Sequence, residues 1–478
     1  MISGGQRRQV RYNATMRVTL ISTYELGRQP FGLASPAAWL RRAGAEVVCL
    51  DTAVQALDRA AIVGATMLGI YVPMHTATRL AATMLPELRA LAPTALIVCY
   101  GLYAPLNAEL LQAQGADACV GGEFEAELVA LYEQAVARST DDRPPSTVHR
   151  PPSTVHRPPS IVLDRLAFLP PDRSGLPGLA SYAQLITPDG PRTVGYTEAS
   201  RGCKHTCRHC PIVPVYGGRF RVVPRAVVLE DVRRQVAAGA QHITFGDPDF
   251  LNGPGHAMAI VRALHTEFPD LTYDVTVKVE HLLRHAELLP ELKATGCALV
   301  TSAIEALDDG ILERFDKRHS VADVARAAEL LRAAGLALNA TFVAFTPWTS
   351  RAVYKAFLTQ IAELGLVESV SPVQYAIRLL LPAGSLLLEL PELREFVGPF
   401  DAASLAHPWQ HPDPAMDALQ RAVMALAQGS ASRSEPRTQF FQRLLTLAEE
   451  QIGMAKPVPL VHLLPRPPIP YLSEPWYC

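Results

Sequence analysis

Short apolar runs alternate with amphipathic stretches over residues 17–137 of the 478-residue chain. The apolar runs are typical of buried strands, and the stretches between them have helical spacing. The predicted strands are Arg17–Ser22, Glu46–Leu50, Met67–Val72, Ala95–Tyr100 and Ala118–Val120, and the predicted helices include Ser35–Ala43, Thr76–Leu91 and Leu106–Gln114. Because each strand is apolar almost throughout, we expect a parallel sheet covered on both faces. This pattern predicts a doubly wound, Rossmann-like α/β domain that binds ligands at the carboxyl ends of its strands.

The same alternation resumes at residue 193. The predicted strands are Thr193–Glu198, His242–Phe245, Thr272–Thr276, Ala298–Ser302, Ala337–Phe342 and Glu368–Gln374. The predicted helices include Arg225–Ala238, Ala257–Phe268, Leu282–Ala294, Val321–Ala334 and Arg351–Leu364. Six such units predict a partial (β/α)6 barrel. In barrel enzymes the residues that do chemistry follow the carboxyl ends of the strands.

The stretches outside these two regions set the domain boundaries. Residues 1–16 lack a periodic pattern and are expected to be a disordered extension. Residues 138–192 form a predicted linker that contains an Arg-Pro-Pro-Ser-Thr-Val-His repeat, and so much proline favours an extended spacer. The barrel is expected over residues 193–390. Residues 391–478 are predicted to be helical, with helices at Met416–Ala427 and Phe440–Glu450, and then proline-rich.

Composition and charge argue against several function classes. Lys and Arg number 44 against 46 Asp and Glu, so the net charge of −2 favours neither nucleic acid nor an anionic membrane as a partner. No apolar run approaches the ~18–20 residues of a membrane-spanning helix. Four of the eight cysteines lie in or beside apolar runs, namely Cys49, Cys99, Cys119 and Cys297. We therefore expect reduced cysteines and a cytoplasmic location.

Three further cysteines, Cys203, Cys207 and Cys210, follow the first predicted barrel strand at the spacing C-x3-C-x2-C. Such a loop can place three thiolates on a 4Fe–4S cluster, which usually takes four, so one iron keeps an open position. In this motif and its barrel context the chain resembles the radical SAM superfamily. The resemblance implies that S-adenosylmethionine (SAM) chelates the open iron and is cleaved to a 5′-deoxyadenosyl radical.

A structural zinc site is the alternative for this loop, because His205 and His209 interleave the cysteines. A closed zinc site needs four ligands, typically in two short pairs, and the sequence has no second pair nearby. Many members of the superfamily have an aromatic residue directly before the third cysteine, where this chain has His209. We prefer the cluster and keep zinc as the alternative.

The resemblance also implies which residues contact SAM. They are Gly246 and Asp247 after the second barrel strand, Lys278 and Glu280 after the third, Glu305 after the fourth, and Arg318. Asp247 is expected to bind the amino group, Glu305 the ribose hydroxyls and Arg318 the carboxylate. Asp249 is expected to cap the following turn as an alternative to a ligand contact. For each charged residue, a helix cap or a surface pair is the structural alternative.

Residues 17–137 resemble the cobalamin-binding domain that precedes many radical SAM domains, with Ala118–Glu125 as the final strand and turn. The resemblance implies cobalamin contacts in the loops at the strand ends, at Met74, His75, Gly101, Gly121, Gly122 and Glu123. The D-x-H-x-x-G motif that supplies a histidine to cobalt is absent. Two interpretations stay open: cobalamin bound without a histidine ligand, and a Rossmann-like domain with no ligand.

The last residues, Leu472–Cys478, resemble the end of the CUAEP/CCAEP-tail radical SAM (seleno)proteins, in which Cys-Cys or Cys-selenocysteine precedes Ala-Glu-Pro. The resemblance implies a selenoprotein candidate that is truncated at the selenocysteine position. Cys478 would then belong to a redox or metal-binding pair. The alternative is that Cys478 is an ordinary terminal residue.

The function expected from these resemblances is that of a cytoplasmic radical SAM enzyme with a 4Fe–4S cluster and SAM as cofactors. An electron donor such as flavodoxin or ferredoxin would reduce the cluster. The substrate would be a small molecule or a peptide, and no nucleic acid or membrane is expected as a partner. If cobalamin is bound, methyl transfer to an unactivated carbon is the expected reaction. The alternative is a zinc- or cluster-stabilised binding protein without turnover.

Overall fold

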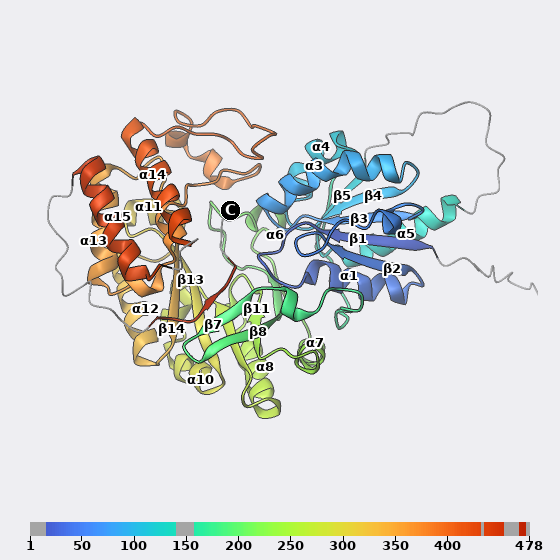
Figure 1. The fold of residues 1–478 in the computed structure, drawn as a ribbon, viewed down its shortest axis with the longest axis horizontal. Helices are drawn as coiled ribbons and strands as arrows, with labels where there is room; N and C mark the ends of the chain where they lie inside the picture. Colours follow the sequence, from blue (N-terminus) through green and yellow to red (C-terminus); the bar gives the residue numbers. More distant parts are fainter. Residues whose placement is uncertain (1–15, 140–156, 432–434, 454–467, 475–478) are drawn as a thin grey trace, which may run out of the picture.

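The computed structural model describes residues 16–139, 157–431, 435–453 and 468–474. Within these ranges the chain forms two α/β units and a helical C-terminal region (Figure 1). The predicted extension up to residue 15, the proline-rich repeat up to residue 156 and Cys478 lie outside the described residues. No helix of the described ranges is both long and apolar enough to cross a membrane.

The first unit is a six-stranded parallel sheet in the order β2-β1-β3-β4-β5-β6. Its elements are β1 (Arg17–Ser22), α1 (Phe31–Arg42), β2 (Glu46–Asp51), α2 (Arg59–Ile62), β3 (Met67–Tyr71), α3 (His75–Leu91), β4 (Leu96–Tyr100), α4 (Ala108–Ala113), β5 (Ala118–Gly122), α5 (Glu125–Ser139) and β6 (Ser160–Val162). One apolar core joins the sheet to α1 and α5, and another joins it to α2, α3 and α4. The predicted doubly wound sheet is therefore confirmed.

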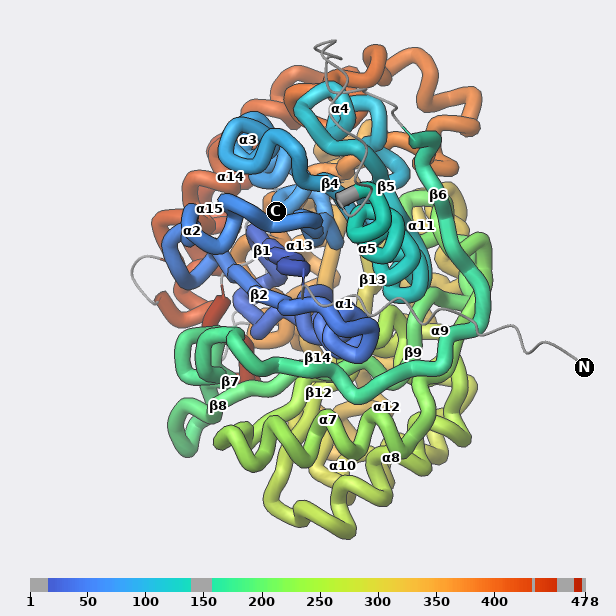
Figure 2. Tube along the Cα trace, turned by 90° about the vertical axis from the view of Figure 1, so that its right-hand side faces the viewer, coloured from blue at the N-terminus to red at the C-terminus, as the bar shows by residue number. Residues whose placement is uncertain are grey.

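The expected linker contributes more structure than its composition suggested. β6 extends the first sheet beside β5, and residues after it run along α1 (Figure 2), where Asp172 N donates to Ala34 O at 2.9 Å. Arg173 also binds Asp231 through two hydrogen bonds of 3.0 Å, which joins this segment to the second unit.

The second unit contains a seven-stranded sheet in the order β14-β13-β12-β11-β8-β7-β15. Its strands are β7 (Gln184–Thr187), β8 (Gly190–Thr197), β11 (His242–Phe245), β12 (Thr272–Thr276), β13 (Cys297–Glu305), β14 (Ala337–Phe342) and β15 (Tyr471–Leu472), and β9 (Ser200–Gly202) pairs with β10 (Phe220–Val222). The helices are α6 (Val213–Tyr216), α7 (Arg225–Ala237), α8 (Pro254–Glu267), α9 (Val279–Arg284), α10 (Leu289–Ala294), α11 (Asp309–Arg314), α12 (Val321–Ala333) and α13 (Arg351–Glu363). The strands from β8 to β14 run parallel, as in the predicted partial barrel.

Two predicted elements differ from the structure, both at prolines. The sixth strand, expected over Glu368–Gln374, is wrong: 3₁₀ turns form at Val367–Ser369 and Pro372–Tyr375, and only Val370 makes a bridge, to Ala340. Pro372 has no N–H to donate to a sheet ladder. The helix expected over Leu282–Ala294 is divided into α9 and α10, with Pro290 in the first turn of α10.

The C-terminal helices pack on α13 and on the 3₁₀ turns that follow it. The predicted helices are confirmed as α14 (Pro414–Ala431) and α15 (Arg437–Ile452), and Phe440 and Phe441 of α15 pack on Tyr375. β15 then pairs antiparallel with β7 at the far edge of the sheet. Glu474, two residues after the end of β15, accepts a hydrogen bond of 2.9 Å from the hydroxyl of Tyr24 in the first unit.

We expect Gly32→Ala to destabilise the first unit. A Cβ at this position of α1 would lie 2.1 Å from the Tyr71 ring. Overpacking of this kind typically costs ~1–3 kcal/mol. The matched control is Gly255→Ala in α8, where a Cβ meets nothing within 4 Å, so its stability should be unchanged or slightly higher. Thermal unfolding of both variants is the measurement, and equal transition temperatures would contradict this packing.

Candidate active site

The three cysteines of the C-x3-C-x2-C motif lie in the loop from β9 to α6. Gly202 starts this loop with φ of +69°, and a Cβ there would lie 2.3 Å from the carbonyl oxygen of Arg219, so the close approach of β9 to β10 requires glycine. Cys203 and Cys207 are buried, and Cys210 N donates to Cys207 O at 3.1 Å. The loop thus turns back on itself and keeps the cysteines together.

The three thiol groups share one electrostatic environment. Burial raises the pKa of Cys210 to about 12, with Cys207 and Cys203 adding to the rise and Lys317 opposing it. Burial also raises the pKa of Cys203. Lys278 Nζ lies 3.6 Å from Cys207 Sγ. Three thiolates at this place require nearby positive charge, which the buried lysines and a bound metal centre can supply.

Glu305, at the end of β13, lies beside His209, the residue directly before the third cysteine. Its carboxyl group is ionised. Its Oε1 is 3.1 Å from His209 Nε2 and 3.5 Å from Lys317 Nζ. Burial favours a higher pKa, but Lys317 and His209 outweigh it and hold the pKa of Glu305 at about 2. Its φ of +75° is rare for a residue with a side chain. Such backbone strain often marks functional positions.

Arg318 is not brought into this cluster. Its side chain is 56% exposed, with Nε 3.5 Å from Asp316 Oδ1. The neighbouring Lys317 is 3% exposed and is the cation that faces Glu305. Sequence reasoning missed Lys317, because two adjacent cations in a loop carry no periodic signal about which one points inward.

Asp247 and Gly246 support the strand that leads to the cysteines. Asp247 Oδ2 accepts a hydrogen bond of 2.9 Å from Ala199 N, and its Oδ1 accepts one from the Ser200 hydroxyl. Burial raises the pKa of Asp247 to about 7, although both donors oppose the rise. A Cβ on Gly246 would lie 1.7 Å from Tyr196 Oη. Their contacts to SAM stay predictions.

Glu280 and Asp249 also lie beside the cysteine loop. Glu280 Oε2 is 3.8 Å from Lys278 Nζ and 3.6 Å from His205 Nδ1. Asp249 Oδ1 accepts a hydrogen bond of 3.3 Å from Leu251 N, which confirms the predicted cap. The two histidines of the loop therefore face carboxylates: His209 faces Glu305, and His205 faces Glu280. This arrangement gives no support to a zinc site shared by these histidines and the cysteines.

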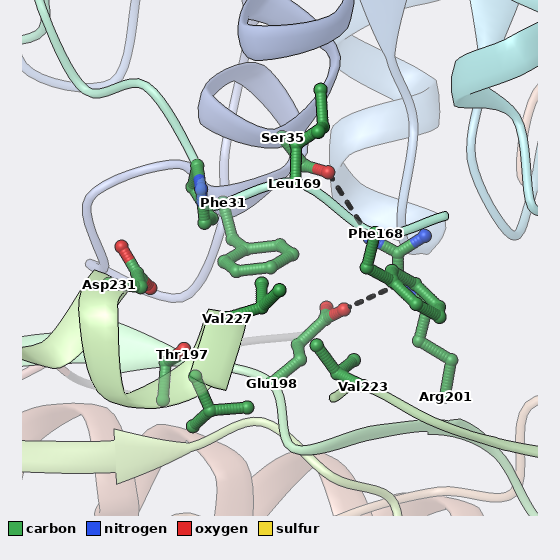
Figure 3. A pocket seen from close by; sticks show the side chains of 12 residues that line it. Phe31, Ser35, Phe168, Leu169, Thr197, Glu198, Arg201, Val223, Val227 and Asp231 are labelled. Atoms are coloured by element: carbon green, nitrogen blue, oxygen red, sulfur yellow. Dashed lines mark hydrogen bonds and ion pairs between the residues drawn. The ribbon is translucent and has the colours of Figure 1, made fainter. Parts of the chain in front are cut away.

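Arg201, two residues before Cys203, joins the two units. Its guanidinium makes ion pairs of 3.1 Å to Glu123, 2.7 Å to Glu125 and 2.8 Å to Glu198. Figure 3 shows this side chain beside a small recess, with its bond to Glu198 dashed. Burial raises the pKa of Glu123 and of Glu198 even though Arg201 opposes the rise. The predicted cobalamin contact Glu123 is therefore used to hold the cysteine strand.

A cavity of about 150 Å³ lies between the units. Its walls come from the carboxyl ends of the first sheet and from the strand, loop and helix around the cysteines; they include Tyr71, Pro73, Leu102, Gly122, Phe124, Ser200, Gly202, Ile212, Tyr216, Gly246 and Pro248. The cavity thus places the end of β11 opposite the ends of β3, β4 and β5. A small ligand here would contact both units.

The remaining predicted cobalamin residues serve mainly the packing of the protein itself. A Cβ on Gly101 would lie 3.0 Å from the Tyr71 ring, on Gly121 2.6 Å from Pro105, and on Gly122 2.1 Å from Val162 O. Met74 is the N-cap of α3, and His75 Nε2 contacts Ser404 O at 2.6 Å. Of these residues, Gly122 alone lines the cavity between the units.

Residues 197–353 match the sequence profile of the radical SAM superfamily. This part of the chain is a radical SAM domain. The chain is 29% identical over 151 residues to hopanoid C-3 methylase of Methylococcus capsulatus, which covers 32% of this chain and 29% of that protein. It is 28% identical over 185 residues to ribosomal protein uS12 methylthiotransferase RimO of Desulfosudis oleivorans, which covers 36% of this chain and 40% of that protein. The chain therefore matches less than half the length of either relative.

Two solved radical SAM enzymes share the fold beyond this domain. The cobalamin-dependent enzyme OxsB superposes over 91% of this chain and 71% of its own, with TM-score 0.67 and 13% identity. The methyltransferase TsrM of Kitasatospora setae superposes over 86% of this chain and 89% of its own, with TM-score 0.60 and 16% identity. At these identities the likeness concerns the fold, which joins a Rossmann-like unit, a partial barrel and a C-terminal region.

The carboxyl group of Glu25, at the interface between the units, makes the stability of the folded state depend on pH. Burial, with help from Glu198, raises its pKa from 4.5 to about 8. The folded state therefore keeps a proton that the unfolded chain loses above pH 4.5, so stability falls as pH rises toward 8, by up to about 1.4 kcal/mol per pH unit.

We expect Glu25→Gln to remove this slope. Urea unfolding at pH 5.5 and 7.5 should show that the wild type loses about 2–3 kcal/mol more than the variant between the two values. The control is Glu46→Gln, at a carboxylate that is 52% exposed on β2, which should keep the wild-type slope. Equal slopes in wild type and Glu25→Gln would contradict a protonated Glu25.

Proposed function

We propose that this protein is a radical SAM enzyme that binds a 4Fe–4S cluster through Cys203, Cys207 and Cys210 and cleaves SAM reductively at the remaining iron. When bound, the cluster and SAM supply a 5′-deoxyadenosyl radical that abstracts hydrogen from the substrate. The observation that carries the proposal is the loop of three neighbouring, largely buried cysteines after β8, inside the radical SAM domain. The alternative binding protein without turnover would need no open iron position.

The residues around the cysteines suit a site that holds several negatively charged groups. Lys278 and Lys317 are buried beside the cysteines, where they offset thiolates and the carboxylate of SAM. In this proposal Lys317 takes the role expected of Arg318. Glu305, held ionised, is an acceptor for the ribose hydroxyls, which are donors.

The other proposed contacts lie on the β11 and β12 side. Asp247 and Gly246 are the contacts proposed for the SAM amino group, and Gly246 lies at the wall of the cavity. Glu280 is the proposed partner that keeps Lys278 in place. Each cleavage consumes one electron, which a protein donor of the flavodoxin or ferredoxin kind would deliver. The proposed substrate class is a small molecule or a peptide.

Methyl transfer to an unactivated carbon is the proposed reaction class. The shared fold with OxsB and TsrM and the similarity to a hopanoid methylase support it. The cavity between the units is where cobalamin would contact both of them. Its volume of about 150 Å³ is below the ~300–1,000 Å³ of ordinary ligand pockets, so the cavity must widen to admit a corrin. Cobalamin binding would require the units to separate.

Cys203→Ala should abolish formation of 5′-deoxyadenosine after anaerobic reconstitution with iron and sulfide, reduction and addition of SAM, because the cluster loses one of three thiolates. The control is Cys297→Ala in β13, whose buried thiol lies outside the motif and should leave iron content and product unchanged. Zinc in place of iron in the wild type, or a cluster that never cleaves SAM, would favour the binding protein.

Cobalamin binding is tested separately. Wild-type protein reconstituted with hydroxocobalamin should retain about one cobalt per chain after gel filtration, and Leu102→Trp should retain much less because it fills the cavity wall. The control is Leu80→Trp on the solvent side of α3, where the leucine is 46% exposed. Wild-type protein that retains no cobalt would overturn the cobalamin proposal while leaving SAM cleavage intact.

A further inference from the structure

A second group of possible metal ligands lies beside the cysteine loop. It consists of His205 in that loop, Asp249 after β11 and His281 in α9. One ligand atom from each residue lies within 4.8 Å of the other two. The three side chains are almost fully buried, at 8%, 0% and 5% exposure. We propose that these three residues bind one divalent transition-metal ion, separate from the cluster.

Among the described residues the facing atoms make ion-pair contacts with one another but no hydrogen bond of standard geometry. This holds for His205 Nε2, Asp249 Oδ2 and His281 Nδ1. Such burial without a hydrogen bond costs free energy, and native proteins rarely leave it unexplained. His281 Nδ1 is only 2.7 Å from Asp249 Oδ2, yet their directions do not make a hydrogen bond. An ion pair between a protonated imidazole and the carboxylate is the alternative to a metal ion for this contact.

The distances suit a metal ion of ordinary bond length. Bonds of about 2.0–2.2 Å place ligand atoms about 3–3.5 Å apart. His281 Nδ1 lies 2.7 Å from Asp249 Oδ2, below this range, and His205 Nε2 lies 3.5 Å from it, at the upper end. All three atoms lie within 4.8 Å of one another, so a bound ion requires a small adjustment of the side chains. The other oxygen of Asp249 is used by the cap of the following turn, which fixes the carboxylate.

A carboxylate lies beside the second ring nitrogen of one of the histidines. Glu280 Oε2 lies 3.6 Å from His205 Nδ1, the ring nitrogen opposite the proposed ligand atom. Metal-binding histidines usually have a carboxylate or carbonyl at their second nitrogen, which fixes the ring. Glu280 itself accepts a hydrogen bond of 2.6 Å from Arg284.

The donor set indicates the class of ion. Two imidazole nitrogens and one carboxylate oxygen suit zinc or ferrous iron, whereas calcium and magnesium prefer oxygen ligands alone. Three protein ligands leave at least one position open to water or a small ligand. Because the ligands come from three separate segments, the ion would also join the cysteine loop to the ends of β11 and β12.

Zinc binding to the cluster-loaded protein tests this site. Holoenzyme with four irons per chain is treated with a chelator, passed through a desalting column and dialysed against buffered Zn²⁺. One additional zinc per chain is expected. His281→Gln and Asp249→Asn should weaken zinc binding at least tenfold while the iron content stays at four. The matched control is His285→Gln, because the centroid of its ring lies 5.7 Å from that of His281 but His285 is not one of the three converging ligands; this variant should bind zinc as wild type does.

Zinc-edge X-ray absorption of the wild type gives a second readout that does not depend on any variant. Nitrogen and oxygen neighbours alone are expected. Sulfur neighbours would mean that zinc occupies the cluster cysteines and would overturn the proposal. Wild-type protein that binds no zinc at micromolar free metal, variants that bind it unchanged, or variants that lose zinc only together with iron would overturn it as well.

Discussion

One buried guanidinium, that of Arg201, determines how the two units meet. Its three carboxylate partners come from both units, and it precedes the first cysteine by two residues. One cation cannot offset three buried anions, which is why burial still raises the pKa of Glu123 and Glu198. Removing the guanidinium would typically cost ~3–5 kcal/mol, because the three carboxylates would stay buried without a cation. The position of the cysteine loop thus depends on an interaction between units.

The sequence predicted the parallel strands well because their apolar runs are long and almost uninterrupted. This holds for β1 to β5 and for β11 to β14. It failed where an element depends on a partner strand more than on its own composition. β6, β7 and β15 have two to four residues each and exist because an edge is available to pair with. The opposite error is the strand expected at Pro372. Its apolar pattern is typical of a strand, but Pro372 has no N–H to donate to a neighbouring strand.

The sequence showed where the site lies along the chain, but not which side chains face one another in it. The spacing of the cysteines marked the loop, and the rule that working residues follow barrel strands led to Asp247, Lys278 and Glu305. Which way each side chain points depends on backbone turns that a pattern does not contain. Lys317 faces inward and Arg318 outward because Asp316 and Arg318 adopt positive φ values of 51° and 58°. Contacts across units, such as that of Arg201 with Glu125, have no local signal at all.

The pairing of β15 with β7 has a consequence for the order of assembly. The residues of β15 and Glu474 are synthesised long after β7 and Tyr24, with which they pair. Both units can therefore form, and the cysteine loop can meet its metal, before the final strand is laid down. The final strand then ties the edge of the barrel to the loop after β1. The contact between Tyr24 and Glu474 therefore forms after both units have been synthesised.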